Sequence, residues 1–284
     1  SIDVRPDRGQ KAFADSMAMI GGGPAATAAA TVARLDAKAS FIGPVGEDVI
    51  GDLILEDLSR WGVDTHRVRR HPSASSPVST ITVEGDGERT IINHTDHRLL
   101  EPADRVTEAD LTGADAVLGD LLWPNGALSA MEAARRLGIP AVLDFDHVRS
   151  GPIAAALTAP THIVFSAPAL TEMSGEIDAE RGLRTIAAKT DAWIAVTLGA
   201  AGVLWRDDDG ETHSFPAFAV DVVDTLGAGD VFHGAFALGL AEGRSMESVI
   251  RRASATAALK CTHFGGRAGL PSADEVDEFL SKRS

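Results

Sequence analysis

Residues Val223–Phe236 read VDTLGAGDVFHGAF, a glycine turn followed by an acid and then an apolar run of helical character. A β-branched run over Phe218–Val223 predicts a strand that leads through Asp224 into the turn at Gly227–Gly229. Glycines at the start of a helix leave backbone N–H groups uncovered, which creates a binding site for an anion. Asp230, directly after the turn, can take a proton from a hydroxyl as that hydroxyl attacks phosphorus. The stretch therefore predicts a site for phosphoryl transfer.

The composition of the 284-residue chain is that of an ordinary globular enzyme, with 44% hydrophobic and 24% charged residues. A formal net charge of −15 and the absence of tyrosine argue against nucleic-acid binding, which needs a basic face and uses aromatic stacking. The single cysteine, Cys261, excludes an intramolecular disulfide and a cysteine zinc cluster. No apolar run reaches the ~20 residues of a membrane span, and no leader or lipidation motif is evident. We therefore expect a cytoplasmic protein with neither a nucleic-acid nor a membrane partner.

Short apolar runs alternate with helical patterns from Phe41 onward. This alternation predicts a mostly parallel sheet with helices on both faces, which is the α/β class. Ligands bind such sheets at the carboxyl ends of the strands, where Asp144, Asp146, Ser166 and the loop after Thr197 fall. The expected strands are Ala116–Gly119, Ala141–Phe145, His162–Phe165, Trp193–Thr197 and Gly202–Trp205, and the expected helices are Gly126–Leu137, Ile153–Ala159, Ala179–Ala188, Val231–Ala241 and Ser248–Cys261.

One segment departs from this alternation. Pro77–Asn93 shows two alternating strands around Gly85–Glu88, which has the turn chemistry of a β-hairpin. Lys11–Ile20 alternates weakly and is a candidate for a third strand beside it. A small sheet of this kind is either a lid over a ligand site or an ordinary extension of the sheet edge, and the pattern favours the lid.

Two further glycine-containing segments are candidate ligand loops. Gly21–Gly23 precede an alanine-rich helix and would let a ligand approach the backbone closely, although a simple tight turn explains them equally well. Thr197–Gly202 joins two strands and is either a plain hairpin turn or a loop that contacts nucleotide phosphates. Neither segment identifies a ligand on its own.

Taken together, these segments resemble the ribokinase/PfkB family of carbohydrate kinases over nearly the whole chain. DTLGAGD at Asp224–Asp230 is similar to the second signature of that family, and Gly21–Gly23 with the following helix is similar to the first. Ile42–Asp48, the hairpin, Thr197–Gly199 and Ala258–Lys260 occur in the order that the family shows.

The resemblance implies a three-layer α/β/α ribokinase-like core with a small β-sheet lid. The core would comprise residues 21–74 and 101–284, with the ATP and catalytic site, and the lid would comprise residues 1–20 and 75–100, over the sugar site. Family members often pair their lids, which implies a homodimer. Unpaired strand edges would otherwise invite uncontrolled association.

The resemblance also implies roles for individual residues. Asp230 would deprotonate the sugar hydroxyl, and the amides of Gly227, Ala228 and Gly229 would stabilise the transferring phosphoryl group. Mg²⁺ would bridge the phosphates of ATP, and a monovalent cation such as K⁺ is common in the family beside Asp224. The residues expected along ATP are Thr197, Gly199, Gly202 and Ser166, and those expected around the sugar are Gly22, Gly23, Asn93, Leu122 and Asp230.

Within the family, the chain is most similar to bacterial 6-deoxy-6-sulfofructose kinases. The similarity lies in GGGPAATAA at Gly21–Ala29, VDVVDTLGAGDVFHGA at Val220–Ala235 and ALKCTHFGGRAGLP at Ala258–Pro271. Asn93 also matches a substrate-contacting asparagine of those kinases. Leu122 departs from their pattern, because they carry an arginine there that binds the sulfonate, and arginine is the natural bidentate partner of such a group.

We therefore expect an ATP-dependent kinase that transfers the γ-phosphoryl group to a primary hydroxyl of a ketohexose-like sugar, with sulfofructose as one candidate. If a sulfonate binds without an arginine at position 122, Arg98 and Arg267 are the candidate cations. The alternatives are a nucleoside or sugar-acid kinase of the same fold, and a sugar sensor that does not catalyse. The intact Gly227–Asp230 segment argues against the sensor, which has no need of a base.

Overall fold

The computed structural model describes residues 9, 11, 13–14, 16–83, 89–100, 105–146, 152–207 and 209–283. The expected hairpin turn at Gly85–Glu88 lies outside these residues. Within the described part of the chain, no helix combines the length and the apolar character that crossing a membrane requires.

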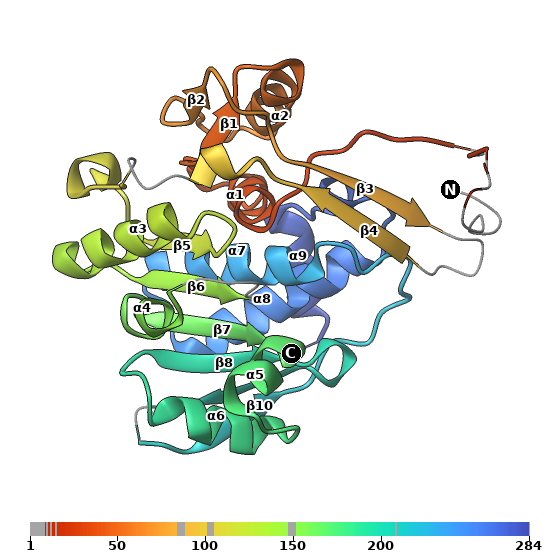
Figure 1. The fold of residues 1–284 in the computed structure, drawn as a ribbon. Coiled ribbons are helices and arrows are strands. Elements are labelled where there is room, and N and C mark those ends of the chain that lie inside the picture. The colour runs from red at the N-terminus through yellow and green to blue at the C-terminus, as the bar shows by residue number, and fades with distance from the viewer. Residues whose placement is uncertain are drawn as a thin grey trace.

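A six-stranded sheet forms the centre of the molecule, as Figure 1 shows, with the strand order β10-β9-β8-β7-β6-β5. The β5–β6, β6–β7 and β7–β8 pairs are parallel, whereas β8–β9 and β9–β10 are antiparallel. The mostly parallel sheet is therefore confirmed, and the five strands predicted for it, β5 to β9, have bounds within one residue of those observed. The strands are β5 (Val117–Asp120), β6 (Ala141–Phe145), β7 (His162–Ser166), β8 (Trp193–Thr197), β9 (Val203–Arg206) and β10 (Thr212–Phe215).

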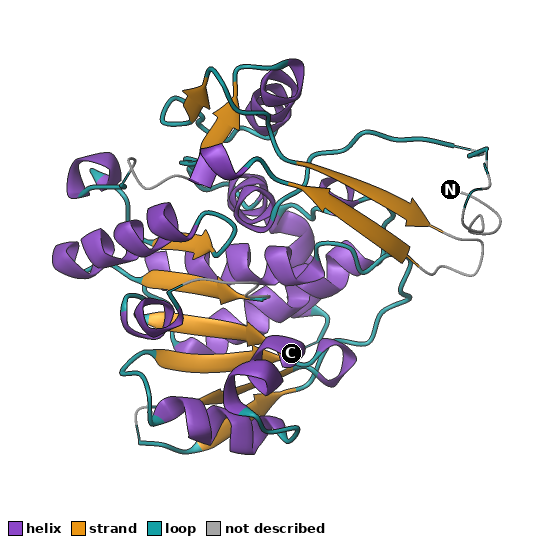
Figure 2. Ribbon diagram, viewed as in Figure 1, coloured by secondary structure: helices purple, strands orange, loops and turns teal. Residues whose placement is uncertain are grey.

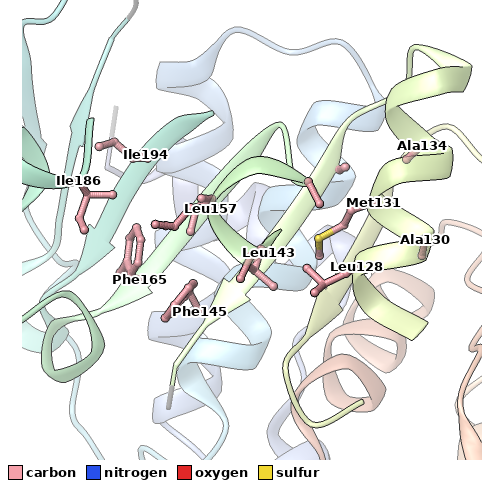
Figure 3. Close-up of a cluster of buried hydrophobic side chains, with 14 of the residues drawn as sticks. Leu128, Ala130, Met131, Ala134, Leu143, Phe145, Leu157, Phe165, Ile186 and Ile194 are labelled. Carbon is pink, nitrogen blue, oxygen red and sulfur yellow. The ribbon is translucent and has the colours of Figure 1, made fainter. Parts of the chain in front are cut away.

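Helices cover both faces of this sheet, which gives the molecule three layers (Figure 2). Alternate residues of each strand point to opposite faces, so Leu143, Phe145 and Phe165 lie on one side, in the same buried cluster as Leu128 and Met131 (Figure 3). That side carries α3 (Pro124–Leu137), α4 (Ile153–Thr158), α5 (Ala167–Ser174) and α6 (Ala179–Ala187), and the other carries α7 (Ala228–Ala241), α8 (Met246–Cys261) and α9 (Ala273–Ser281).

Helix α1 (Pro24–Arg34) packs closely against α7. A Cβ added at Gly234 of α7 would lie only 2.6 Å from the carbonyl oxygen of Ala28 in α1, so glycine is required at this crossing. The contact continues to the start of α7, where a Cβ at Gly227 would lie 3.7 Å from Thr27 Cγ2. The first turns of α1 and α7 are therefore neighbours.

A small sheet and a helix follow α1 in the chain, and this helix packs against α1. β1 (Pro44–Gly46) and β2 (Arg69–His71) form a parallel two-stranded sheet, and α2 (Val49–Arg60) follows β1. The side chain of Asp48 caps α2 by accepting a hydrogen bond from the Gly51 N–H. Short 3₁₀ helices complete the structure, namely η1 (His97–Leu100), η2 (Glu108–Leu111), η3 (Gly199–Ala201) and η4 (Gly266–Gly269).

The predicted hairpin is present as β3 (Val78–Val83) and β4 (Arg89–His94), an antiparallel pair that extends away from the six-stranded sheet (Figure 1). The third strand expected over Lys11–Ile20 is wrong, because the described residues of that segment form no strand. The apolar side chains that are described in this segment are exposed, so no burial enforces the alternation. The division of the chain into core and lid stays a prediction.

The strand expected over Phe218–Val223 is also wrong, because this segment is irregular. The N–H groups of Val223 and Asp224 instead bond the carbonyl oxygen of Cys261, at the end of α8. A β-branched run forms a strand only where a neighbouring strand supplies hydrogen-bond partners for its backbone. Here the end of a helix supplies the acceptor instead. Val222 and Val223 consequently stay exposed.

Candidate active site

The glycine turn, Gly227–Gly229, leads into α7 as expected, but the helix begins three residues earlier than the predicted Val231, so Asp230 lies in its first turn. Gly227 caps the helix in the left-handed region, at φ 79°, which favours glycine. Among the described residues, the N–H groups of Gly227 and Gly229 have no hydrogen-bond partner, whereas the Ala228 N–H donates to the Thr225 carbonyl oxygen at 3.2 Å. Two of the three expected amides can therefore receive an anion.

Asp230 is half-buried beside this turn. Burial, together with the charges of Asp144 and Asp120, raises the pKa of Asp230 to about 7, although His233 acts in the opposite direction. A carboxyl that titrates near neutral pH can hold and release a proton under physiological conditions. The position therefore suits a general base.

A buried carboxyl–imidazole pair stands behind Asp230. Asp144 is the penultimate residue of β6, and His233 lies one helical turn after Asp230. Nδ1 of His233 lies 3.3 Å from Oδ2 of Asp144, and both side chains are 5% exposed. Burial raises the pKa of Asp144 well above its ordinary range, and it lowers the pKa of His233. Burial thus disfavours the charged form of each group, and the negative charge of Asp144, where present, raises the pKa of Asp230.

Asp120, at the end of β5, is a site residue that sequence reasoning missed. Its Oδ2 accepts a hydrogen bond of 3.0 Å from the Ala25 N–H in the first turn of α1, and its Oδ1 accepts one of 2.8 Å from the Leu122 N–H. Its position could have indicated it, because Asp120 directly follows the predicted strand Ala116–Gly119 and so lies at the carboxyl end of a strand, where ligands bind such sheets. Asp120 fixes the start of α1 to the sheet.

Arg267 holds the turn that precedes α1. It is 4% exposed, its Nη2 donates to the Gly22 carbonyl oxygen at 2.6 Å, and its Nη1 pairs with Asp57. A Cβ at Gly21 would collide with both members of that ion pair, so this glycine is required by a close approach rather than by a ligand. Gly22 and Gly23 are exposed and remain the part of the turn that can face a substrate.

The residues expected along ATP meet at the carboxyl ends of two neighbouring strands. Ser166 of β7 and Thr197 of β8 are register partners. After Thr197, the chain turns through Gly199 and Gly202, whose φ angles are 57° and 97°. The Leu198 N–H donates a hydrogen bond to the Gly202 carbonyl oxygen, which closes this turn. Ser166 also caps α5. The structure therefore groups these four residues on one sheet edge.

The two residues expected to select the sugar lie on different elements. Asn93 lies on β4, where its Oδ1 accepts a hydrogen bond from the Ser79 hydroxyl at 2.7 Å. The side chain of Leu122 follows β5 and is 61% exposed. Among the described residues, neither forms a hydrogen bond with Asp230. Their roles stay predictions.

Asp224 connects the glycine turn to the end of α8. Its carboxylate accepts hydrogen bonds of 2.9 Å from the N–H groups of Leu226 and Gly265. Lys260, in the last turn of α8, is fully buried and donates from Nζ to the Asp224 carbonyl oxygen at 2.7 Å. Sequence reasoning assigned Lys260 no role, although a lysine inside a helix of small residues is an unusual signal.

Comparison with known proteins gives a consistent result. A family model for pfkB family carbohydrate kinases matches residues 3–273. Ribokinase from Lactococcus lactis is 30% identical over 285 residues, which cover 98% of this chain and 91% of that protein. A crystal structure of a candidate ribokinase from Agrobacterium tumefaciens has a TM-score of 0.94 at 41% identity, over 99% of this chain and 93% of the other. Arabidopsis thaliana ribokinase complexed with ribose and ATP has a TM-score of 0.86 at 25% identity, over 98% and 93%.

Proposed function

The chain belongs to the pfkB family of carbohydrate kinases, and on that basis we propose that it transfers the γ-phosphoryl group of ATP to a sugar hydroxyl, with Asp230 as the general base. One observation carries the assignment of the base. Asp230 is a half-buried carboxyl with a pKa of about 7, and it lies in the first turn of a helix whose leading N–H groups are available to an anion.

The reaction follows from this geometry. Asp230 accepts the proton of the sugar hydroxyl while the hydroxyl oxygen attacks the γ-phosphorus; the bond from this phosphorus to the β–γ bridging oxygen breaks, and ADP leaves with that oxygen. The N–H groups of Gly227 and Gly229 donate to the phosphoryl oxygens, over which negative charge spreads in the transition state. The positive end of the α7 dipole acts in the same direction.

The ATP site would lie along the sheet edge at Ser166, Thr197, Gly199 and Gly202. The Arabidopsis relative is complexed with ribose and ATP, which supports an ATP site in this fold. The described residues contain no group of three or more metal-ligating side chains. Mg²⁺ needs none, because it keeps several waters and binds mainly through substrate phosphates and one or two carboxylates. The exposed Asp146 would be its protein ligand, and the ion would neutralise charge on the phosphates.

We propose a neutral monosaccharide as the acceptor, with a ketohexose as the first candidate and its primary hydroxyl as the site of transfer. Leu122 cannot pair with a sulfonate, and the two alternative cations are already engaged. Arg267 binds Asp57 and Gly22, and Arg98 binds Asp96. A sulfofructose kinase would need one of these arginines to leave its partner.

The acceptor is tested by measuring ADP release with ribose, deoxyribose, fructose, sulfofructose, a sugar acid and a nucleoside. The matched control is Asp230→Asn, which keeps the shape of the side chain but cannot take a proton. We expect turnover of a neutral sugar, and a ~10²–10⁴-fold loss of kcat in the variant with ATP and sugar affinity nearly intact.

The outcomes separate the alternatives. A variant that retains more than about a tenth of the wild-type kcat would contradict the base assignment. Preferred turnover of sulfofructose, a sugar acid or a nucleoside would contradict a neutral monosaccharide as the acceptor, but it would still support the kinase activity. A sugar that raises the Tm while ADP release stays flat with every acceptor would indicate the sensor instead.

A further inference from the structure

Lys260 places a positive charge inside the protein, beside Asp224, which precedes the glycine turn. None of its surface is exposed, and its Nζ lies 2.7 Å from the Asp224 carbonyl oxygen and 3.8 Å from Oδ2 of the Asp224 carboxylate. Asp224 is itself 3% exposed. A buried carboxylate requires a compensating charge close by, and the Lys260 ammonium supplies it from the chain itself.

The surroundings of Asp224 therefore do not suit a monovalent cation. Such an ion binds backbone carbonyl and carboxylate oxygens, and at Asp224 the carbonyl oxygen already accepts the lysine proton. The carboxylate oxygens accept hydrogen bonds from the N–H groups of Leu226 and Gly265. An added K⁺ at these oxygens would lie against an ammonium group of the same charge. We infer that Lys260 is a built-in cation, and that the protein binds no monovalent ion at Asp224.

The position of Lys260 gives this charge a role in the proposed reaction. The Asp224 carboxylate accepts one hydrogen bond from the Leu226 N–H, just before the glycine turn, and another from the Gly265 N–H, two residues before Arg267. By neutralising Asp224, Lys260 keeps this carboxylate buried and so orders the turn that carries Gly227 and Gly229. Lys260 is thus a positioning residue, and this part of the inference rests on the proposed kinase function.

The first test compares wild-type protein in KCl with the same protein in tetramethylammonium chloride, at equal ionic strength. We expect initial rates that agree within about twofold and the same Tm, because an ion that binds only the folded state would raise the Tm with its concentration. A rate or Tm that rises specifically with K⁺ would overturn the inference.

The second test removes the ammonium with Lys260→Ala, and Lys282→Ala is the matched control. Lys282 is an exposed lysine that pairs with Glu278 on α9, so its removal should change neither rate nor Tm. For Lys260→Ala we expect a Tm lower by at least ~5 °C, because removing one partner of a buried pair is strongly destabilising. We also expect a loss of at least ~10-fold in kcat, since the N–H groups of the turn lose their fixed position.

Added K⁺ or ethylammonium should restore part of both losses in Lys260→Ala, because either cation can enter the space that the side chain leaves. Losses that no cation reduces would show a packing role only and contradict the inference. If Lys260→Ala does not fold, the comparison of wild-type protein in KCl and in tetramethylammonium chloride tests the inference alone. The Tm measurements stay informative if no acceptor is found, so a failure of the kinase proposal shows only in the rates.

Discussion

At Asp230, burial is the first cause of the pKa of about 7, and the neighbouring carboxyl of Asp144 is the second. Asp146, only two positions beyond Asp144, is exposed. Two residues of the same type therefore have different surroundings within one site, because water reaches Asp146 freely and Asp230 only in part. The position of α7 on the sheet, rather than the residue type, therefore raises the pKa of Asp230.

We predict that kcat/KM for the sugar rises with pH up to about 7 and then levels off. A base must be ionised to act, and the raised pKa of Asp230 keeps it protonated below that value. Asp144→Asn should shift the midpoint to lower pH, because the ionised form of Asp230 loses an unfavourable neighbour. The pH–rate profile gives both midpoints, with the exposed Asp191→Asn as the control. A wild-type midpoint near 4, or no shift in Asp144→Asn, would contradict this account.

At the scale of elements, the site exists because the first turns of α1 and α7 meet. Asp120 ties α1 to the end of β5, and Gly234 lets α7 approach the α1 backbone within van der Waals distance. The turn at Gly21–Gly23 and the glycine turn at Gly227–Gly229 are thereby held on neighbouring helices. A change at the helix crossing should therefore disturb stability and the site together.

Gly234→Ala tests the crossing. Alanine is normally better than glycine inside a helix by about 1 kcal/mol, but here the new Cβ would lie 2.6 Å from backbone of α1 that cannot move aside. We expect the free energy of unfolding to fall by about 1–3 kcal/mol. Urea unfolding measures it. The control is Gly182→Ala in α6, where the added Cβ meets side-chain atoms of Leu170 at 3.1 Å that can shift. A stabilised Gly234→Ala protein would refute the packing argument.

At the scale of the whole molecule, the β3–β4 hairpin is the element that the fold leaves least covered. Within the described residues it pairs with no further strand, and Ile91 and Ile92 are 50% and 67% exposed. Ile91 is on the same face as Asn93, whereas Ile92 is on the opposite face with Thr80 and His94. We propose that this hairpin pairs with that of a second copy of the chain.

Ile92→Lys should convert a dimer into a monomer, because a charge on an exposed strand prevents both strand pairing and apolar packing. Light scattering after size-exclusion chromatography measures the mass directly. Ile177→Lys is the control, since Ile177 is 92% exposed on a loop far from the hairpin in sequence. A wild-type protein that elutes as a monomer at micromolar concentration would rule out this pairing.

The sequence by itself determined the elements that depend on local pattern. Buried parallel strands are continuous apolar runs, so β6 and β8 lie where they were predicted, and the glycine turn with Asp230 was evident from residue type and order. These local signals carried the family assignment, which the family model and the solved relatives confirm together with the ribokinase-like fold.

Only the tertiary structure decided which distant residues complete the site. Asp120, Arg267 and Lys260 act on the two turns from 95, 245 and 36 positions away along the chain. No periodicity links positions so far apart, because their contacts arise from how helices and strands stack. Burial likewise follows from that stacking. The chain therefore specified an acid after a glycine turn, and the packing of the molecule raised the pKa of that acid to about 7.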